Sequence, residues 1–181
     1  MRKLGEVFIQ GEICVDGFTV FFAAEHSELL KKVLHRFKYI SDDALAEVLG
    51  MLLVMRMKKI IVSAPYTLTP IPLHHARERE RGFNQSELLA GVISRALGGR
   101  VVHVLERRRE TRVQATLSRK ERIYNVRGAF GMRKGFVGKV PETVFVLDDV
   151  ITTGSTFVEC ARVLRAAGVR RVYGIMLAHG L

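Results

Sequence analysis

The 181-residue chain lacks several features that mark whole classes of protein. It has only two cysteines, Cys14 and Cys160, which lie far apart and without the spacing of metal ligands, so we expect neither a disulfide framework nor a structural zinc site. The most apolar run, residues 49–55, is too short to span a bilayer. The first residues carry charges where a signal peptide would need an apolar core. These absences predict a cytoplasmic protein without a membrane span.

The charge of the chain is unevenly distributed. The formal net charge is +11, yet residues 1–73 carry 9 Lys and Arg against 8 Asp and Glu, and residues 140–181 carry 4 against 4. Residues 74–139 carry 16 against 6, so almost the whole excess lies in this segment. A segment this basic is expected to face an anionic partner, either phosphate and pyrophosphate groups or DNA.

One stretch, Val144 to Thr156, combines a buried strand with a polar loop. Its first four residues are apolar, with the β-branched and aromatic members typical of a buried parallel strand, which we expect to end at Asp148 and Asp149. A run of Thr, Gly and Ser then opens a helix with apolar residues at helical spacing, and Gly168 ends that helix. The pattern predicts a strand–loop–helix unit.

The chemistry of this unit suits a sugar phosphate. The N–H groups and the dipole of a helix start favour an anion, and a glycine lets the backbone approach it closely. The carboxylates of Asp148 and Asp149 accept hydrogen bonds from hydroxyl groups or bind hydrated magnesium. Phosphate and hydroxyl groups a few ångströms apart describe a ribose 5-phosphate. The alternative is an ordinary strand–turn–helix whose Ser and Thr side chains cap the helix.

All thirteen residues of this stretch resemble the phosphoribosyl-pyrophosphate (PRPP) loop of type I phosphoribosyltransferases. The resemblance implies that Asp148 and Asp149 hold the ribose 2- and 3-hydroxyls of PRPP, which binds with Mg2+. It implies that the 5-phosphate is bound by the loop residues Thr152, Thr153, Gly154, Ser155 and Thr156. It also implies an α/β fold with a mostly parallel, twisted sheet flanked by helices. We predict this phosphoribosyltransferase core over residues 59–181, with a small hood-like appendage of hairpin and helices over residues 1–58.

The appendage has local signals of its own. Asp16-Gly17 between two apolar runs is the signal of a two-residue β-hairpin, and residues 7–9 are a further candidate strand. Amphipathic helices are expected from about Ser27 and from about Ser41. We interpret residues 36–39, at the end of the first helix, as a solvated terminus, with a substrate-facing end as the alternative.

The middle of the chain alternates strands with basic stretches. Residues 66–73 form an apolar strand ending in prolines, and a basic loop is expected over residues 74–85. Either Asn84 or Ser86 introduces the next helix. Residues 101–105 are expected to be a second core strand.

A polar stretch and a short helix over residues 118–124 follow that strand. Here the phosphoribosyltransferase resemblance implies a mobile loop that closes over substrate and excludes water. A solvated basic loop is the alternative.

Two further motifs narrow the resemblance. The segment from Pro72 to Ala90, which contains R-G-F-N-Q-S-E-L-L-A, and the segment from Arg109 to Phe130 resemble the ComF/GntX competence-protein family in this order. Members of that family commonly begin with a four-cysteine zinc module. Only Cys14 is available here, so a zinc-bound N-terminus is not expected.

The resemblance implies an enzyme in which a nitrogen nucleophile displaces pyrophosphate at C1 of PRPP. Arg77 and Arg81 are our candidates for binding pyrophosphate, and Arg109 for the closing loop. Hypoxanthine–guanine enzymes have an aspartate base at the position of Thr152, so a purine acceptor handled that way is not expected, and the acceptor stays unidentified. The alternative is a non-catalytic or vestigial PRPP-fold protein that handles single-stranded DNA during DNA uptake through residues 74–139. The sequence is compatible with an oligomer.

Overall fold

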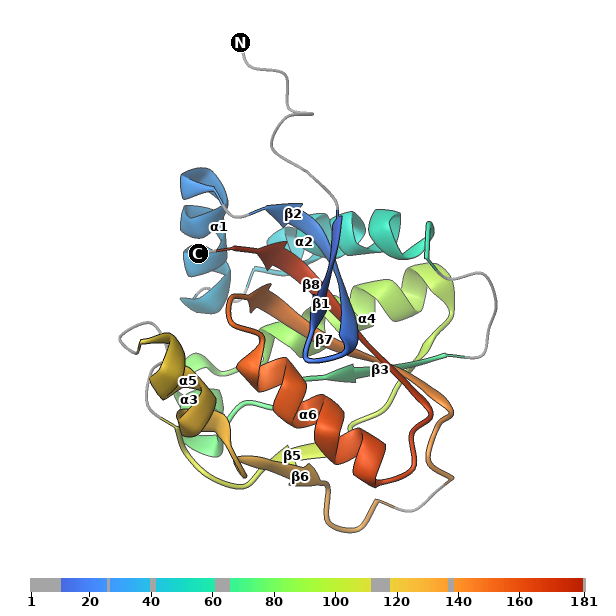
Figure 1. Cartoon of the computed structure of the whole chain (residues 1–181). Coiled ribbons are helices and arrows are strands. Elements are labelled where there is room, and N and C mark those ends of the chain that lie inside the picture. The colour runs from blue at the N-terminus through green and yellow to red at the C-terminus, as the bar shows by residue number, and fades with distance from the viewer. Residues whose placement is uncertain are drawn as a thin grey trace.

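A computed structural model describes residues 11–25, 27–39, 42–60, 66–111, 118–136 and 139–180. Within these residues, one sheet has the strand order β1-β2-β8-β7-β3-β4 (Figure 1). In chain order its strands are β1 (Gly11–Val15), β2 (Phe18–Glu25), β3 (Thr67–Pro70), β4 (Arg100–Val101), β7 (Thr143–Ile151) and β8 (Arg171–His179). Neighbouring strands are parallel except in the antiparallel hairpin of β1 and β2. The predicted α/β class with a mostly parallel sheet is confirmed.

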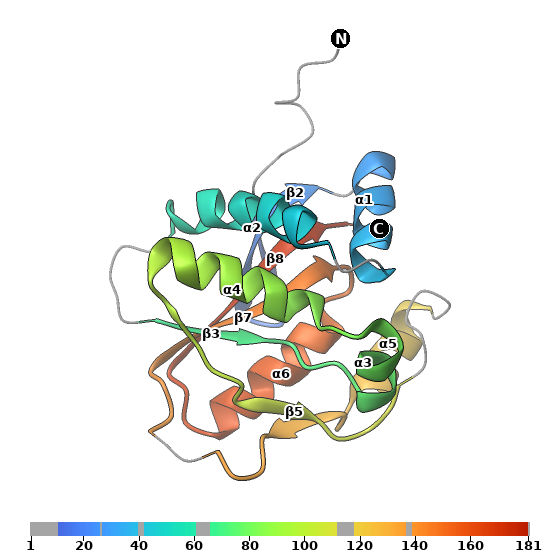
Figure 2. The same cartoon turned by 180° about the vertical axis from the view of Figure 1, so that it is seen from behind.

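Helices cover both faces of this sheet. They are α1 (Glu28–Tyr39), α2 (Asp43–Met57), α3 (His75–Arg81), α4 (Gln85–Leu97), α5 (Arg119–Val126) and α6 (Ser155–Ala166). Figure 2 shows α2 and α4 in front of the sheet, and the opposite view in Figure 1 shows α6 on the other face. A separate antiparallel pair, β5 (Leu105–Arg107) and β6 (Phe130–Met132), contacts α6 through β6. None of the helices in the described ranges is both long and apolar enough to cross a membrane.

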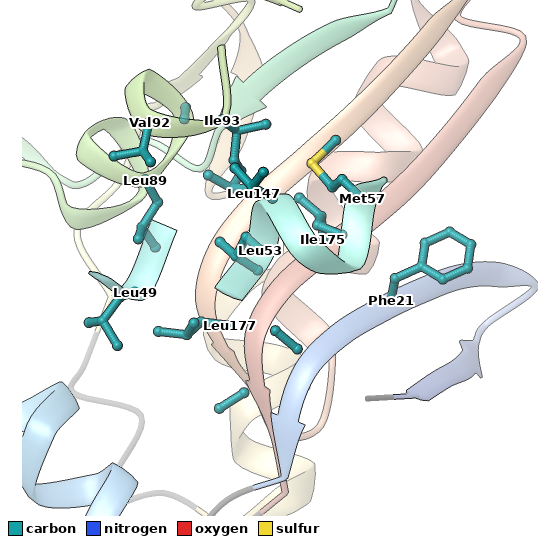
Figure 3. Close-up of a cluster of buried hydrophobic side chains, with 14 of the residues drawn as sticks. Phe21, Leu49, Leu53, Met57, Leu89, Val92, Ile93, Leu147, Ile175 and Leu177 are labelled. Atoms are coloured by element: carbon teal, nitrogen blue, oxygen red, sulfur yellow. The ribbon is translucent and has the colours of Figure 1, made fainter. Parts of the chain in front are cut away.

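Two apolar layers hold the central strand β7. On one side, Leu53 of α2 and Leu89 of α4 pack with Leu147 of β7 and are fully buried (Figure 3). Because successive strand residues face opposite sides, Val146 of β7 packs instead with Phe157 of α6. β7 is therefore buried on both faces, and the loop that follows it begins from a fixed position.

The single strand predicted over residues 101–105 is wrong. Its beginning pairs with β3 as β4, whereas Leu105 belongs to β5 and pairs with β6. The Val104 N–H donates to the carbonyl of Val102 at 3.1 Å, so the chain turns between the two strands and leaves the main sheet. Apolar residues on both sides of this turn made the segment resemble one continuous strand.

The basic loop predicted over residues 74–85 contains helix α3, so that prediction is wrong in part. The helix follows His74 and ends at Gly82, whose φ of +78° is a conformation that glycine adopts without strain. No residue of α3 is buried, so it has no hydrophobic period by which sequence could reveal it. Asn84, and not Ser86, caps α4: its side chain accepts the Ser86 N–H at 3.0 Å.

The hairpin and both helices predicted within residues 1–58 are present. Asp16-Gly17 turns between β1 and β2 with positive φ at both residues. The cap of α2 is Asp42, whereas Ser41 and the candidate strand at residues 7–9 lie outside the described residues. β2 pairs with β8 and α2 packs on α4, so these elements extend the sheet and core of the remaining chain. The division into two domains at residue 58 stays a prediction.

Candidate functional site

Asp148 and Asp149 lie within β7 and not after its end, so the predicted strand boundary is wrong. β8 continues to pair with β7 as far as Ile151. On its other side β7 loses its partner earlier, because β3 ends at Pro70, opposite Leu147. The acidic pair therefore borders the open space beyond the carboxyl end of β3. Ligands of parallel α/β sheets bind at such ends.

The loop Thr152 to Thr156, for which the sequence predicts phosphate binding and which we call the phosphate loop, leads from β7 into α6. Gly154 is the N-cap of α6 and makes no side-chain cap. The Ser155 N–H donates to Thr153 Oγ1 at 3.4 Å, which is long for a hydrogen bond, and the two hydroxyl oxygens are 3.0 Å apart. The loop residues line a pocket together with Asp148, Val150, Ile151, Phe157 and Met176. Hydroxyl groups, a helix N-terminus and a carboxylate thus border one space.

Gly154 also packs against the N-terminal hairpin. Its φ is +72°, and a Cβ at this position would lie 2.6 Å from Cγ1 of Val15, the last residue of β1. The next residue, Asp16, pairs with Arg162 of α6 at 2.7 Å. The hairpin turn therefore rests on the phosphate loop, and this contact requires glycine for a second reason besides backbone conformation.

Burial and, after it, the neighbouring Asp149 carboxylate raise the pKa of Asp148 to about 7. Two hydrogen bonds oppose this shift by stabilising the charged form. The Ser86 hydroxyl donates to Asp148 Oδ1 at 2.9 Å, and the Asp149 N–H donates to the same atom at 2.9 Å. Ser86 is itself buried at the start of α4, so its hydroxyl is held toward the acidic pair.

The raised pKa of Asp148 predicts a pH-dependent stability. The folded protein holds a proton on this carboxyl up to about pH 7, whereas the unfolded chain releases it near pH 4. The contribution of the protonated Asp148 carboxyl to the free energy of unfolding is therefore complete below about pH 4 and is lost as the pH rises to about 7. We expect Asp148→Asn, which cannot ionise, to lose this slope. Urea unfolding of both proteins at several pH values measures it, and a stability difference that is constant from pH 4 to pH 7 would contradict the assignment.

Lys38, near the C-terminal end of α1, reaches the second carboxylate. Its Nζ lies 2.8 Å from Asp149 Oδ2, and the exposed fractions of the two side chains are 30% and 12%. Burial by itself lowers the pKa of Lys38, but the carboxylates of Asp149 and Asp148 together more than offset this, so the pKa lies above its ordinary value. The interpretation of residues 36–39 as a solvated terminus is wrong for Lys38, and the alternative of a substrate-facing end stays a prediction.

The R-G-F-N-Q-S motif joins these parts into one network. Asn84 donates to the carbonyl of Ile71 at 3.0 Å and so fixes the start of α4 to the end of β3. Gln85 donates to the carbonyl of Lys38 at 3.2 Å and accepts from Arg81 at 3.1 Å. The guanidinium of Arg81 also lies over an aromatic ring, 5.6 Å from the centre of Tyr39. The motif thus fixes the end of α1, which carries Lys38, to the start of α4 and holds Arg81 against both.

A second arginine cluster contains Arg107 and Arg77, whose predicted role in binding pyrophosphate stays a prediction. Both are joined to Thr111: Arg77 donates to its carbonyl at 3.4 Å and Arg107 to its hydroxyl. Burial and the nearby Arg77 lower the pKa of Arg107, while the charge of Asp148 raises it. Arg107 Nε is buried and has no hydrogen-bond partner among the described residues. The sequence did not single out Arg107 among the neighbouring arginines. The available signal was its place in β5, where Arg107 and the buried Leu105 are two residues apart and so share one face of the strand.

The other arginines of this run have structural contacts. Arg108 pairs with Glu106 at 2.9 Å. Arg109 donates to the carbonyls of Asn125 and Arg127 at 2.9 and 3.1 Å, so it holds the C-terminal end of α5. Its predicted place in a closing loop stays a prediction, and the residues from Arg112 to Leu117 lie outside the described part of the chain.

The chain is similar in sequence to several curated proteins, although no family model matches it. It is 32% identical over 150 residues to "Competence protein F" of Haemophilus influenzae, covering 80% of this chain and 66% of the relative. It is 30% identical over 161 residues to "Competence protein ComFC" of Streptococcus pneumoniae, covering 88% and 68%. It is 30% identical over 154 residues to "DNA utilization protein YhgH" of Escherichia coli K12, covering 82% and 66%. The chain thus spans about two thirds of the length of these relatives.

Among solved structures, the protein TT1426 from Thermus thermophilus aligns with a TM-score of 0.44 at 14% identity. The alignment covers 75% of this chain and 83% of that protein.

Proposed function

This chain belongs to the family of the competence proteins F and ComFC, and from its site we propose that it binds PRPP and transfers the phosphoribosyl group to a nitrogen nucleophile. One observation carries the proposal: the phosphate loop and Asp148 line a single pocket. A helix N-terminus favours a phosphate and carboxylates accept from hydroxyl groups, so the pocket matches both ends of a ribose 5-phosphate.

In the proposed complex, the loop residues 152–156 bind the 5-phosphate through backbone N–H groups and hydroxyls. Asp148 and Asp149 accept hydrogen bonds from the ribose hydroxyls. These contacts fix the sugar, so that C1 is presented to the acceptor in one orientation. Because Lys38 already pairs with Asp149, either the carboxylate binds Lys38 and the ribose hydroxyls together, or the ion pair opens when the ribose binds.

The proposed reaction breaks the bond between C1 and the pyrophosphate oxygen. Pyrophosphate leaves with the bonding electron pair, the lone pair of the acceptor nitrogen forms the new bond to C1, and the nitrogen releases a proton to solvent. Arg107, whose charge interacts with Asp148, and the candidates Arg77 and Arg81 are proposed to stabilise the charge that develops on the leaving group. No covalent nucleophile from the protein is needed.

The donor set also fits magnesium bound together with PRPP. No cluster of three or more metal-ligating side chains occurs in the described ranges, so the protein by itself offers no closed metal site there. Magnesium is commonly held by one or two carboxylates together with substrate phosphates, a role for which Asp148 and Asp149 are placed. When bound, the ion supplies positive charge to the pyrophosphate oxygens.

Calorimetric titration with three ligands of increasing size tests the proposal. Inorganic phosphate probes the loop, ribose 5-phosphate adds the hydroxyls, and PRPP with Mg2+ adds the pyrophosphate. Affinity is expected to rise at each step. If ribose 5-phosphate binds no more tightly than phosphate, the acidic pair does not hold the ribose and the proposal is wrong.

A second candidate function is binding of single-stranded DNA. The observation in its favour is the excess of positive charge in residues 74–139, together with relatives whose names refer to competence and DNA utilization. Exposed cations suited to contact phosphates in this segment include Lys120, Arg133 and Lys134. Arg107, Arg108 and Arg109 are less suitable for a test, because their side chains hold β5, β6 and α5 together.

The salt dependence of DNA affinity separates the two functions. If the basic segment contacts DNA phosphates, replacing Lys120, Arg133 and Lys134 with alanine should flatten the slope of log affinity against log salt by about 0.7 to 0.9 for each lost contact. PRPP affinity should not change, since these side chains lie outside the pocket. Weak DNA binding with the same slope in both proteins would exclude this surface as a DNA site.

A further inference from the structure

Helix α5 brings an arginine to the phosphate loop from a distant part of the chain. The Arg122 guanidinium donates through Nη1 to the hydroxyl oxygen of Thr152 at 3.1 Å. Thr152 is the first residue of the loop and lines the pocket beside β7. A positive charge therefore lies at the rim of the space in which we place the 5-phosphate.

The rest of α5 is built so that this arginine is held in place. At its N-terminus Ser118 and Glu121 form a capping box, in which each side chain accepts the other's backbone N–H. At its C-terminus Arg109 donates to the carbonyls of Asn125 and Arg127. Arg122 thus projects from a short helix that is fixed at both ends.

The contact also orients the threonine hydroxyl. Because Thr152 Oγ1 accepts from Arg122, its own O–H proton points away from the guanidinium and is available to donate to an anion. A guanidinium presents several N–H donors in one plane, so the same group is able to bond Thr152 and a phosphate oxygen together. The two side chains then form one donor surface.

We propose that Arg122 is a phosphate-binding residue that clamps the 5-phosphate against the loop from the side of α5. The inference rests on the proposed function, since it assigns a further residue to the same phosphate. It places part of the sugar-phosphate site on the basic middle segment, outside the strand–loop–helix unit that resembles the PRPP loop. Arg109 then acts as a positioning residue for this site, because it holds the helix that carries Arg122.

Titration with ribose 5-phosphate, without magnesium, tests this directly. We expect Arg122→Ala to weaken binding by about 10- to 100-fold, the usual loss for a hydrogen bond to a charged group. Arg122→Lys keeps the charge but loses the planar donor set, so its affinity for ribose 5-phosphate should lie between those of the wild type and Arg122→Ala. Lys120→Ala is the matched control: it removes one positive charge from an exposed side chain of the same helix, outside the pocket at the loop, and should bind like the wild type.

A double-mutant cycle with Thr152→Val measures the coupling between the two side chains in binding ribose 5-phosphate. A variant that merely unfolds does not produce such a coupling. If Arg122 and Thr152 bind one phosphate together, the double variant should lose less affinity than the sum of the two single losses. Thermal unfolding of each variant checks that the fold is retained. If Arg122→Ala does not fold, Arg122→Lys takes its place in the cycle.

Two results would overturn the assignment, and they are distinguishable. If Arg122→Ala and Lys120→Ala both bind ribose 5-phosphate as tightly as the wild type, the clamp is wrong and the proposed function stands. If the wild-type protein binds neither ribose 5-phosphate nor PRPP, the proposed function itself is wrong, and the role of Arg122 with it.

Discussion

Replacing Asp149 with asparagine is expected to weaken binding of PRPP with Mg2+ by about 10- to 100-fold and to leave the affinity for inorganic phosphate unchanged. The carboxylate is buried: one oxygen accepts from the Val150 N–H at 2.8 Å, and the other lies 2.8 Å from Lys38 Nζ and is the one that we propose for the ribose hydroxyls. An amide loses the charge that strengthens hydrogen bonds from ribose hydroxyls, a loss of roughly 1.5 to 3 kcal/mol. The phosphate loop does not depend on that charge.

Calorimetric titration of both proteins with both ligands measures this prediction. Glu142→Gln is the matched control, since it removes one negative charge just before β7 from an exposed side chain that pairs with Arg171. Equal PRPP affinity in the wild type and Asp149→Asn would place the ribose elsewhere. A parallel loss of phosphate affinity would show instead that the substitution disturbs the loop.

Lys38→Met is expected to destabilise the folded protein by about 2 to 3 kcal/mol. It leaves Asp149 as a buried carboxylate beside Asp148, without the ammonium group 2.8 Å away. Removing one partner of a fully buried pair costs roughly 3 to 5 kcal/mol, and solvent at the partly exposed Lys38 reduces this value. Methionine keeps the apolar length of the lysine side chain, so the change mainly removes the charge.

Urea unfolding at pH 7 measures the loss. Lys31→Met on the same helix is the control, because its ion pair with Glu28 is 3.7 Å long and exposed, and its removal should change stability little. Combining Lys38→Met with Asp149→Asn removes both charges and should recover much of the stability. A double variant as unstable as the sum of the single variants would contradict a direct interaction.

Local features of this protein follow from the sequence because neighbouring residues determine them. The turn at Asp16-Gly17, the helix end before Gly168 and the helix start within the phosphate loop each depend on residues with special backbone conformations or capping groups. The buried strand before the loop is marked by its continuous apolar run. These signals were enough to predict an α/β fold and the position of the candidate site.

The rest of the site depends on contacts between distant segments, for which sequence has no local signal. Lys38 belongs to the first helix and Asp149 to a strand near the other end of the chain, so only the strand order and the packing of α1 bring them together. In the same way, Arg107, Arg108 and Arg109 look alike in sequence. The strand period and the bend before β5 give them three different partners.

The contact between the hairpin turn and the phosphate loop makes these two segments one unit in local unfolding. Among the described residues, β1 is an edge strand that pairs with β2 alone, and such edges are among the first parts of a fold to open. Because Val15 lies against Gly154 and Asp16 pairs with Arg162, β1 cannot leave without removing one wall of the loop. By linkage, an anion bound only in the closed form opposes this opening to an extent set by its affinity and concentration. Binding of an anion at the loop is thereby expected to stabilise the edge of the sheet that the hairpin forms.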